Sequence, residues 1–239
     1  MSTNARALEN GVASLASRRA TTRRCGRRAA RTTTRAAVVD PATKISFPDA
    51  SPSGLKALGA GVRVKRIAIV DVKVYALCLY VDAAKAREQR AKGLLRGEYD
   101  KELAIELARE VDGKTFYEAL DDALNPRIRE IATNLATKED EDGNFMASVA
   151  EAAEEAEEAA LDALAEMRDA FVSLKLKQGT KMTISWTPSA SQKVKIDVLG
   201  ETLGFESPVF AQALLDVYVG SAPVAPAAAQ AFENGLARL

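Results

Sequence analysis

Hydrophobic and polar residues alternate over residues 59–80, GAGVRVKRIAIVDVKVYALCLY, and β-branched types dominate this stretch. A period of two is typical of strands that bury one face. The pattern predicts two strands joined by a turn near Val70–Asp71. In such a hairpin Arg63 and Tyr75 lie on the same face and close to one another across the strand pair.

Two further segments show alternation. Residues 180–200, TKMTISWTPSASQKVKIDVLG, predict a second hairpin with its turn at Pro188–Gln192. Leu103–Val111 is ambiguous, because its apolar residues alternate as in a strand whereas its residue types favour a helix. A short strand is expected in KISFPDASPSG, before the first hairpin.

Apolar residues at steps of three and four predict helices. The clearest period covers Phe145–Phe171, where an apolar stripe faces one side and Glu151, Glu154, Glu155, Glu158 and Asp162 cover the other. Further helices are expected in AAKAREQRAKG, ending at Gly93, and in APAAAQAFENGLARL. The segment SPVFAQALLDVYVG predicts a helix that is capped by Ser207 and ended by Gly220.

Between the strands and the long amphipathic helix, two shorter helices are expected. The first, in TFYEALDDAL, has Thr115 and Glu118 at the spacing of a capping box. The second, in NPRIREIATNL, has Asn125 as its cap and Pro126 at its first position. Strands, then helices, a hairpin and terminal helices predict an α+β fold, in which helices pack on one face of a largely antiparallel sheet.

Charge divides the 239 residues unevenly. Residues 1–39 carry nine Arg and one acid, Glu9, giving a net charge of +8, and residues 40–239 carry −8. The basic segment is rich in Ser, Thr and Ala and has no apolar core, so we interpret residues 1–39 as a plastid transit peptide, cleaved near Ala36–Val39. The alternative is a basic arm that binds nucleic acid, but the acidic domain at 40–239 would repel a polyanion.

The absence of histidine narrows the chemistry. It excludes Ser-His-Asp and Cys-His sites, zinc sites that contain His, and an imidazole base. The two cysteines, Cys25 and Cys78, lie on opposite sides of the charge boundary, so no disulfide framework is expected. No apolar run reaches the roughly 20 residues that span a bilayer. We expect no cofactor and no metal site.

Three motifs are set aside. GKT at 113–115 lacks the first glycine of a phosphate loop, and KEDEDGNF lacks the spacing of a calcium loop. Carboxylates along one helical face are typical of a solvated surface. The alternative, an interaction module that uses the acidic helix 145–171 as a docking surface, stays open.

Arg63 has two interpretations. A surface arginine near the start of a strand is common. A guanidinium beside a tyrosine hydroxyl also suits a carboxylate, which it holds through two parallel hydrogen bonds. If Ile67, Ile69, Leu77 and Leu79 share its face, they form an apolar pocket with a charged end, suited to a carboxylate head and a hydrocarbon tail.

Four blocks of the chain resemble the chalcone isomerase fold family, and most closely its plastid fatty-acid-binding members. In order, they are LGAGVRVKRIAIVDVKVYALCLYVD, GKTFYEALDDALNPRI, GTKMTISW and ESPVFAQALLDVYVGSAPVAPAAAQAFENGLA. The resemblance implies an antiparallel sheet with helices packed on one side and the ligand between them. It also implies that Leu103–Val111 is a strand and that the acidic helix is extended by an insertion.

The resemblance offers two functions. Chalcone isomerases keep an Arg, a Thr twelve residues later, and a Tyr and an Asn on the next helix; here those positions hold Arg63, Tyr75, Phe116 and Ala123. Only the arginine of the catalytic set is retained. The fatty-acid-binding members keep the Arg and a Tyr on the next strand, which Arg63 and Tyr75 match.

The expectation is therefore non-catalytic binding of a long-chain fatty acid in an apolar pocket. Arg63 and Tyr75 are the ligand-binding residues, and no catalytic residues are assigned. The protein is expected in the plastid stroma, in support of fatty-acid metabolism, with no nucleic-acid partner, no stable membrane insertion and no assigned oligomeric state. The enzymatic alternative is a chalcone isomerase, an intramolecular lyase that closes chalcone to flavanone.

Overall fold

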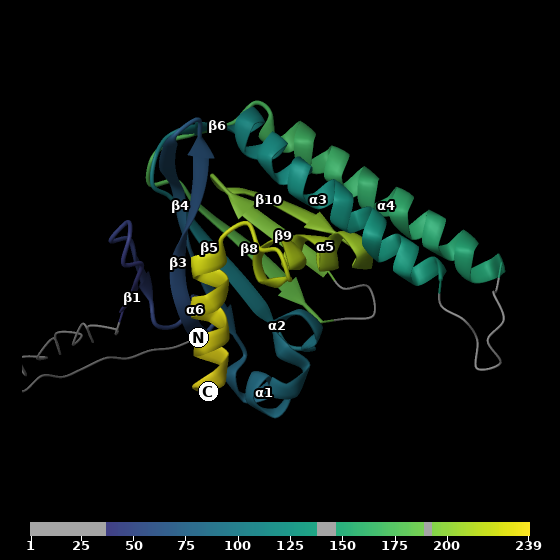
Figure 1. The fold of residues 1–239 in the computed structure, drawn as a ribbon, viewed down its shortest axis with the longest axis horizontal. Coiled ribbons are helices and arrows are strands. Elements are labelled where there is room, and N and C mark those ends of the chain that lie inside the picture. The colour runs from purple at the N-terminus through teal and green to yellow at the C-terminus, as the bar shows by residue number, and fades with distance from the viewer. Residues whose placement is uncertain (1–36, 138–146, 189–192) are drawn as a thin grey trace, which may run out of the picture. The chain divides into compact units, whose positions relative to one another are not determined.

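The computed structural model describes residues 37–137, 147–188 and 193–239, and its centre is a six-stranded antiparallel sheet (Figure 1). The predicted α+β class is confirmed. The strand order is β10-β9-β8-β5-β4-β3, so the two predicted hairpins lie on opposite sides of β5. The strands of this sheet are β3 (Lys56–Ile67), β4 (Val70–Val81), β5 (Lys101–Leu107), β8 (Lys181–Thr187), β9 (Lys193–Val198) and β10 (Glu201–Phe205).

The first hairpin, β3–β4, brings Arg63 and Tyr75 together on one face as predicted, but its turn is shifted. Arg63 is the direct partner of Tyr75 in the antiparallel register. The turn lies at Ala68–Ile69 and not at Val70–Asp71, and Ala68 takes a left-handed conformation with φ 53°. No glycine or asparagine marks this turn, which is why the sequence pattern places it two residues too late.

The predicted apolar face of this hairpin is only half correct. Leu77 and Leu79 are fully buried, but Ile67 and Ile69 are 53% and 87% exposed. A register shift between Arg63 and Val64 marks a bulge, and a bulge bends and twists the strand that carries it. Ile67 and Ile69 therefore lie at the hairpin tip and do not line a pocket with Leu77 and Leu79.

The remaining elements surround this sheet. The helices are α1 (Ala83–Glu88), the 3-10 turn η1 (Arg90–Lys92), α2 (Gly93–Arg96), α3 (Gly113–Ala136), α4 (Ala147–Phe171), α5 (Pro208–Val219) and α6 (Pro226–Ala237). Two short strand pairs join β1 (Ala37–Val39) to β2 (Ser46–Pro48), and β6 (Val111–Asp112) to β7 (Lys175–Leu176). The ambiguous segment Leu103–Val111 contributes β5, as the resemblance implies.

Helix α3 is continuous, so the prediction of two helices with a new start at Asn125 was wrong. Pro126 lies inside it, and the helix begins at Gly113 without the predicted capping box. The buried stripe continues through the proline, from Phe116 to Ala132, so packing overrides the local break. The side chains of Asn125 and Arg127 also donate to carbonyls of the preceding turn.

The other helices follow the pattern with small changes. Helix α5 is capped by Ser207, whose hydroxyl accepts from the Phe210 amide, and Gly220 follows its last residue, as predicted. The polar helix predicted over residues 83–93 is divided into α1 and η1, and its predicted end at Gly93 was wrong, because Gly93 begins α2. The described part of α4 buries its apolar stripe and exposes Glu151, Glu154, Glu155, Glu158 and Asp162; Phe145 lies outside the described residues. A docking role for this acidic face stays a prediction.

The main core lies between the sheet and helices α3, α4 and α5, which pack against the same face (Figure 1). A smaller cluster on the opposite face of β3 and β4 is centred on Phe47, Cys78 and Tyr80, and β1 and β2 cover it. Val38 of β1 packs against this cluster. A mature chain that began at Asp40 would lack β1; the transit peptide itself stays a prediction.

Helix α6 lies directly on β3 because that strand has glycines where the two elements meet. A Cβ at Gly61 would stand 2.5 Å from the Cα of Ala228, and one at Gly235 would stand 2.1 Å from the carbonyl oxygen of Leu58. This close approach fixes α6 along the strand that carries Arg63. Within the described ranges, no helix is both long and apolar enough to cross a membrane.

Candidate functional site

Arg63 and Tyr75 meet near the end of the β3–β4 hairpin, as the sequence predicts. An Arg63 Nη1–H donates to Tyr75 Oη over 3.1 Å, and the guanidinium carbon lies 5.5 Å from the centre of the tyrosine ring. Tyr75 is fully buried, whereas Arg63 is half-buried. The contact holds the guanidinium by one donor and leaves its other donors available to an anion.

A second tyrosine, which the sequence analysis did not single out, completes the polar group. Tyr218 of α5 is 1% exposed, and its hydroxyl has no hydrogen-bond partner among the described residues. Burial raises the pKa of Tyr218 well above its usual value, and the nearby Tyr75 adds to the rise. The two hydroxyls thus interact electrostatically without hydrogen-bond geometry, and Tyr218 retains its proton as a donor.

Arg63 stays protonated in this partly buried site. Burial acts to lower its pKa, but the nearby Tyr75 and Tyr218 outweigh that effect, and the pKa lies above its ordinary value. Arg63 forms no ion pair with any carboxylate of the described chain, although Asp122 lines the same cavity. A cation that is partly removed from water and lacks an acidic partner is suited to hold an anion.

Aromatic rings continue inward from this group. The Phe116 ring of α3 lies 5.9 Å from that of Tyr75, tilted by 48°. It also stacks at 5.8 Å on Phe171, the last residue of α4. Phe116 and Ala123 stand where the resemblance places the Tyr and the Asn of chalcone isomerases, so neither position supplies a polar group here.

An open cavity of about 380 Å³ lies at the guanidinium. Its walls are Arg63, Val64, Lys65 and Arg66 of β3, Ala119, Asp122 and Ala123 of α3, and Val224 of the loop between α5 and α6. This volume is at the low end for ligand sites. Its β3 wall is basic, with Arg63, Lys65 and Arg66, and Asp122 of α3 is its one acidic residue.

Arg127 holds the loop that forms one wall of this cavity. Its Nε–H donates to Asp216 of α5 over 2.7 Å, and its Nη2–H donates to the Ala222 carbonyl over 2.5 Å. The ion pair with Asp216 is largely buried and joins α3 to α5. The bond to Ala222 joins α3 to the loop two residues before Val224. The cavity wall is thus fixed by a charge-assisted contact and not by apolar packing alone.

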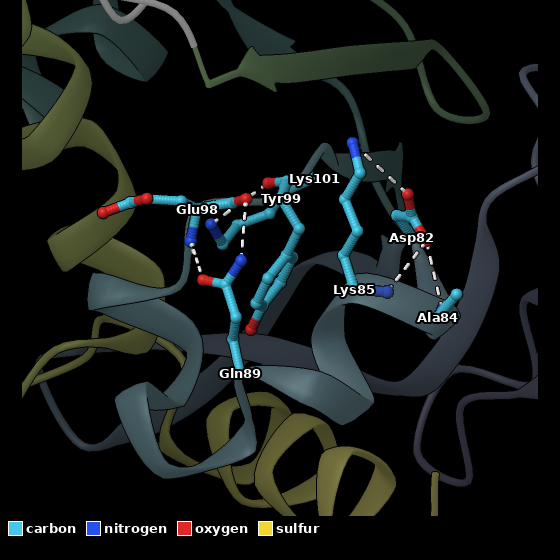
Figure 2. A network of polar contacts seen from close by, with 7 residues as sticks. All are labelled: Asp82, Ala84, Lys85, Gln89, Glu98, Tyr99 and Lys101. Carbon is cyan, nitrogen blue, oxygen red and sulfur yellow. Dashed lines mark hydrogen bonds and ion pairs between the residues drawn. The ribbon is translucent and has the colours of Figure 1, made fainter.

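A larger cavity, of about 900 Å³, lies at the other end of β5, between α1–α2, α5 and the β8–β9 hairpin. Figure 2 shows the polar network at its edge, where Gln89 accepts from the Glu98 amide and Asp82 accepts from the amides of Ala84 and Lys85. Its rim carries both signs of charge, including Lys85, Glu88, Arg96 and Glu98. It shares no residue with the Arg63 cavity.

Lys101 beside this larger cavity has a structural role. It is 5% exposed, and its ammonium group donates to the carbonyls of Gly97 and Tyr99 and lies 4.2 Å from the centre of the Tyr99 ring (Figure 2). Burial lowers the pKa of Lys101 to about 8, partly offset by Asp100 and Glu98. The ammonium group remains mostly protonated at neutral pH, and carbonyls already accept two of its three hydrogens.

The sequence thus located two of the three polar residues in the Arg63 group. Tyr218 was missed because its helix meets the strands only through the tertiary fold. Two features of the sequence could have pointed to Tyr218. It belongs to ALLDVYVG, part of a block that carries the family resemblance, and it lies among the apolar residues of a predicted helix. Among the described residues, no three Cys, Asp or Glu side chains gather so as to hold a metal ion.

The architecture, an antiparallel sheet with its helices on one face, is that of the chalcone isomerase-like fold predicted from the sequence. A comparison with solved structures finds a protein of this fold. The crystal structure of the Arabidopsis thaliana fatty-acid binding protein AtFAP1 aligns with a TM-score of 0.61 over 84% of this chain and 98% of that chain, at 16% sequence identity. The chain has the fold of that protein, and the resemblance is confirmed at the level of the fold. No family model and no curated protein sequence matches the chain.

Proposed function

We propose that this protein binds fatty acids without transforming them. The observation that carries the proposal is the group formed by Arg63, Tyr75 and Tyr218, a guanidinium without an acidic partner beside two tyrosine hydroxyls. The fold shared with AtFAP1, a fatty-acid binding protein, supports it. Arg63 is the carboxylate anchor, Tyr75 orients it, and Tyr218 donates a further hydrogen bond to the ligand.

The hydrocarbon tail extends from Arg63 into the layer between the sheet and helices α3 and α4. Side chains such as Phe116 and Phe171 fill that layer, so the tail displaces or reorients them. Each buried methylene contributes ~0.8 kcal/mol, so a tail of about twelve carbons contributes on the order of 10 kcal/mol before ordering costs. The charge-assisted bonds to the head add about 1.5–3 kcal/mol. The tail therefore sets the affinity, and Arg63 sets the orientation and the preference for a carboxylate.

The ligand is a long-chain fatty acid, and the site of action is the plastid stroma. The basic, Ser- and Thr-rich composition of residues 1–39 supports an organellar address. Fusing residues 1–39 to a fluorescent protein tests the address. Import into plastids with loss of the segment is the expected result, and retention in the cytosol would contradict it.

The test of binding is mass spectrometry of lipids that are extracted from the purified protein. Wild type is expected to retain fatty acids, and Arg63→Ala is expected to lose most of them. Equal occupancy in both proteins would overturn the anchor role of Arg63.

The isomerase alternative is tested on the same samples by the decay of chalcone absorbance. Hydroxyl and amide groups that would order water and polarise a ketone are absent at Phe116 and Ala123. Rapid, stereospecific loss of chalcone would contradict the non-catalytic proposal.

A further inference from the structure

The tip of the β3–β4 hairpin exposes an unusual concentration of apolar side chains. Four of the eight large hydrophobic residues that are exposed in the described chain lie within seven positions there. They are Val64, Ile67, Ile69 and Val70, with exposed fractions of 43%, 53%, 87% and 58%. Single exposed aliphatic residues are ordinary on protein surfaces, whereas a contiguous group marks an interaction site.

The tip extends past the rest of the sheet. Strand β4 pairs with β5 only from Tyr75 to Val81, and β3 is the edge strand. The tip, residues 64–73, is therefore a two-stranded ribbon in which each strand pairs only with the other. Figure 1 shows β3 and β4 running together at this side of the sheet. Its apolar residues have no larger core to join.

Basic residues are interleaved with the apolar ones. Lys65, Arg66 and Lys73 are exposed, with Asp71 as the single acid, so the tip is positive in a domain whose net charge is −8. Neither Lys65 nor Arg66 forms an ion pair with another described residue, although Asp71 is the register partner of Arg66. Aliphatic side chains with flanking Lys and Arg are the pattern of segments that bind at the boundary between anionic headgroups and acyl chains.

Charge favours a lipid surface over a second copy of this chain. A two-fold contact between tips would bring two positively charged segments together, and like charges at close range are destabilising. An anionic bilayer instead attracts each of these cations, because its headgroups carry the opposite charge. The apolar residues enter only the outer part of the bilayer, so the contact is reversible.

The tip is also continuous with the Arg63 cavity. Val64, Lys65 and Arg66 belong to both, and Arg63 stands at the base of the ribbon. A fatty acid in a bilayer holds its carboxylate at the level of the headgroups, where a docked tip would bring the arginine. We propose that the hairpin tip, residues 64–73, docks this protein on anionic membrane surfaces and that fatty acids enter beside it at Arg63. The entry route rests on the proposed function, whereas the docking does not.

Flotation with vesicles tests the docking directly. The full folded protein is mixed with vesicles of phosphatidylcholine, or of phosphatidylcholine with phosphatidylglycerol, at low and high salt. Wild type is expected to float with the anionic vesicles, and high salt is expected to weaken the association. The double variant Ile67→Ser, Ile69→Ser is expected to bind about tenfold more weakly. The control Leu199→Ser, at an aliphatic residue in the β9–β10 turn that is about as exposed as Ile67, is expected to bind as wild type does.

A second arm separates docking from ligand binding. The Ile67/Ile69 variant is expected to keep the wild-type equilibrium affinity for fatty acid in solution but to acquire it from vesicles more slowly. Arg63→Ala is expected to float as wild type does while losing fatty acid, so failure of the proposed function is distinguishable from failure of the docking. The proposal would be overturned if wild type did not float with anionic vesicles, or if the double variant floated with them as well as wild type does. A dimer that the double variant converts to monomer would assign the tip to self-association instead.

Discussion

Tyr218 lies beside Tyr75 with its hydroxyl buried and unpaired, although Tyr75 itself accepts a hydrogen bond from Arg63. A buried donor without a partner costs about 1–3 kcal/mol of stability. Such a cost is common where a protein keeps a polar group ready for a ligand. The Tyr218 hydroxyl oxygen should therefore lower the stability of the free protein while contributing to ligand binding.

Tyr218→Phe is therefore expected to affect the two properties in opposite directions. Removal of the unpaired hydroxyl is expected to raise the free energy of unfolding by about 1 kcal/mol, because the ring still fills its place. Loss of the donor is expected to weaken fatty-acid binding by about three- to tenfold. Denaturant unfolding and a fatty-acid titration measure the two effects.

Tyr75→Phe is the matched control. It removes the hydroxyl that accepts from Arg63, so it is expected to weaken binding without raising stability. If Tyr218→Phe lowered stability as much as Tyr75→Phe, the Tyr218 hydroxyl would have a partner in the folded protein, and its role as a free donor would be wrong.

The glycines beneath α6 give a prediction about the scaffold. Gly61→Ala places a methyl group against the backbone of Ala228, which cannot yield as a side-chain end can. The expected loss is about 1–3 kcal/mol of unfolding free energy, with weaker fatty-acid binding because β3 carries Arg63. Gly204→Ala is the control, since a Cβ there meets no atom within 4 Å. Thermal unfolding that ranks the two variants equally would contradict the close packing of α6 on β3.

Alkaline pH is expected to destabilise the fold through Cys78. Burial raises the pKa of its thiol from 9.0 to about 12, so the folded protein holds a proton that the unfolded chain releases. This stabilising contribution is complete below pH 9 and is lost as the pH rises from 9 to about 12. Each such group contributes a slope of about 1.4 kcal/mol per pH unit. Tyr99 and Tyr117, with pKa values raised mainly by burial to about 12, act in the same direction above pH 10.

Cys78→Ala removes this contribution, together with the part of the raised pKa of Tyr80 that Cys78 causes. Its unfolding free energy is expected to fall less steeply above pH 9 than that of wild type, by about 1.4 kcal/mol per pH unit. Lys101 opposes the trend equally in both proteins, because its lowered pKa makes stability rise with pH above about 8. Identical slopes in the two proteins, measured by urea unfolding across this range, would mean that the thiol is accessible to water in the folded state.

The start of the mature chain is testable through β1. Residues 37–39 pair with β2, and Val38 packs on the cluster around Phe47. A chain that begins at Ala37 is therefore expected to be more stable than one that begins at Asp40, and processing is expected before Ala37. Thermal unfolding of the two chains tests the first point, and N-terminal sequencing of the mature protein tests the second. Equal stability would show that β1 contributes little.

Local periodicity was sufficient for much of the fold. Alternation predicted both hairpins and the shared face on which Arg63 and Tyr75 lie close together, because the side-chain period of a strand leaves few alternatives. The same rule failed beyond Arg63, where a bulge that has no signature in the sequence places Ile67 and Ile69 at an exposed tip.

Features that depend on tertiary contacts could not be predicted from the hydrophobic pattern of the sequence. The rule that proline begins a helix predicted a break at Asn125, but the buried stripe of α3 and the side-chain donors around Pro126 keep the helix continuous. The role of Tyr218 depends on how α5 packs in the folded protein, which no local pattern encodes. Strand alternation thus encoded the meeting of Arg63 and Tyr75, whereas the place of Tyr218 depends on tertiary packing.

The most direct test of the account compares a fatty acid with the fatty alcohol of the same length. Binding of both ligands is measured to wild type and to Arg63→Met, which keeps an unbranched side chain and removes the charge. Wild type is expected to prefer the acid by roughly 10- to 150-fold, which is the worth of about 1.5–3 kcal/mol in charge-assisted bonds. Arg63→Met is expected to lose this preference while its affinity for the alcohol stays within about threefold of wild type, since the tail supplies most of the binding energy. A variant that still prefers the acid by the wild-type factor would show that Arg63 is not the carboxylate anchor.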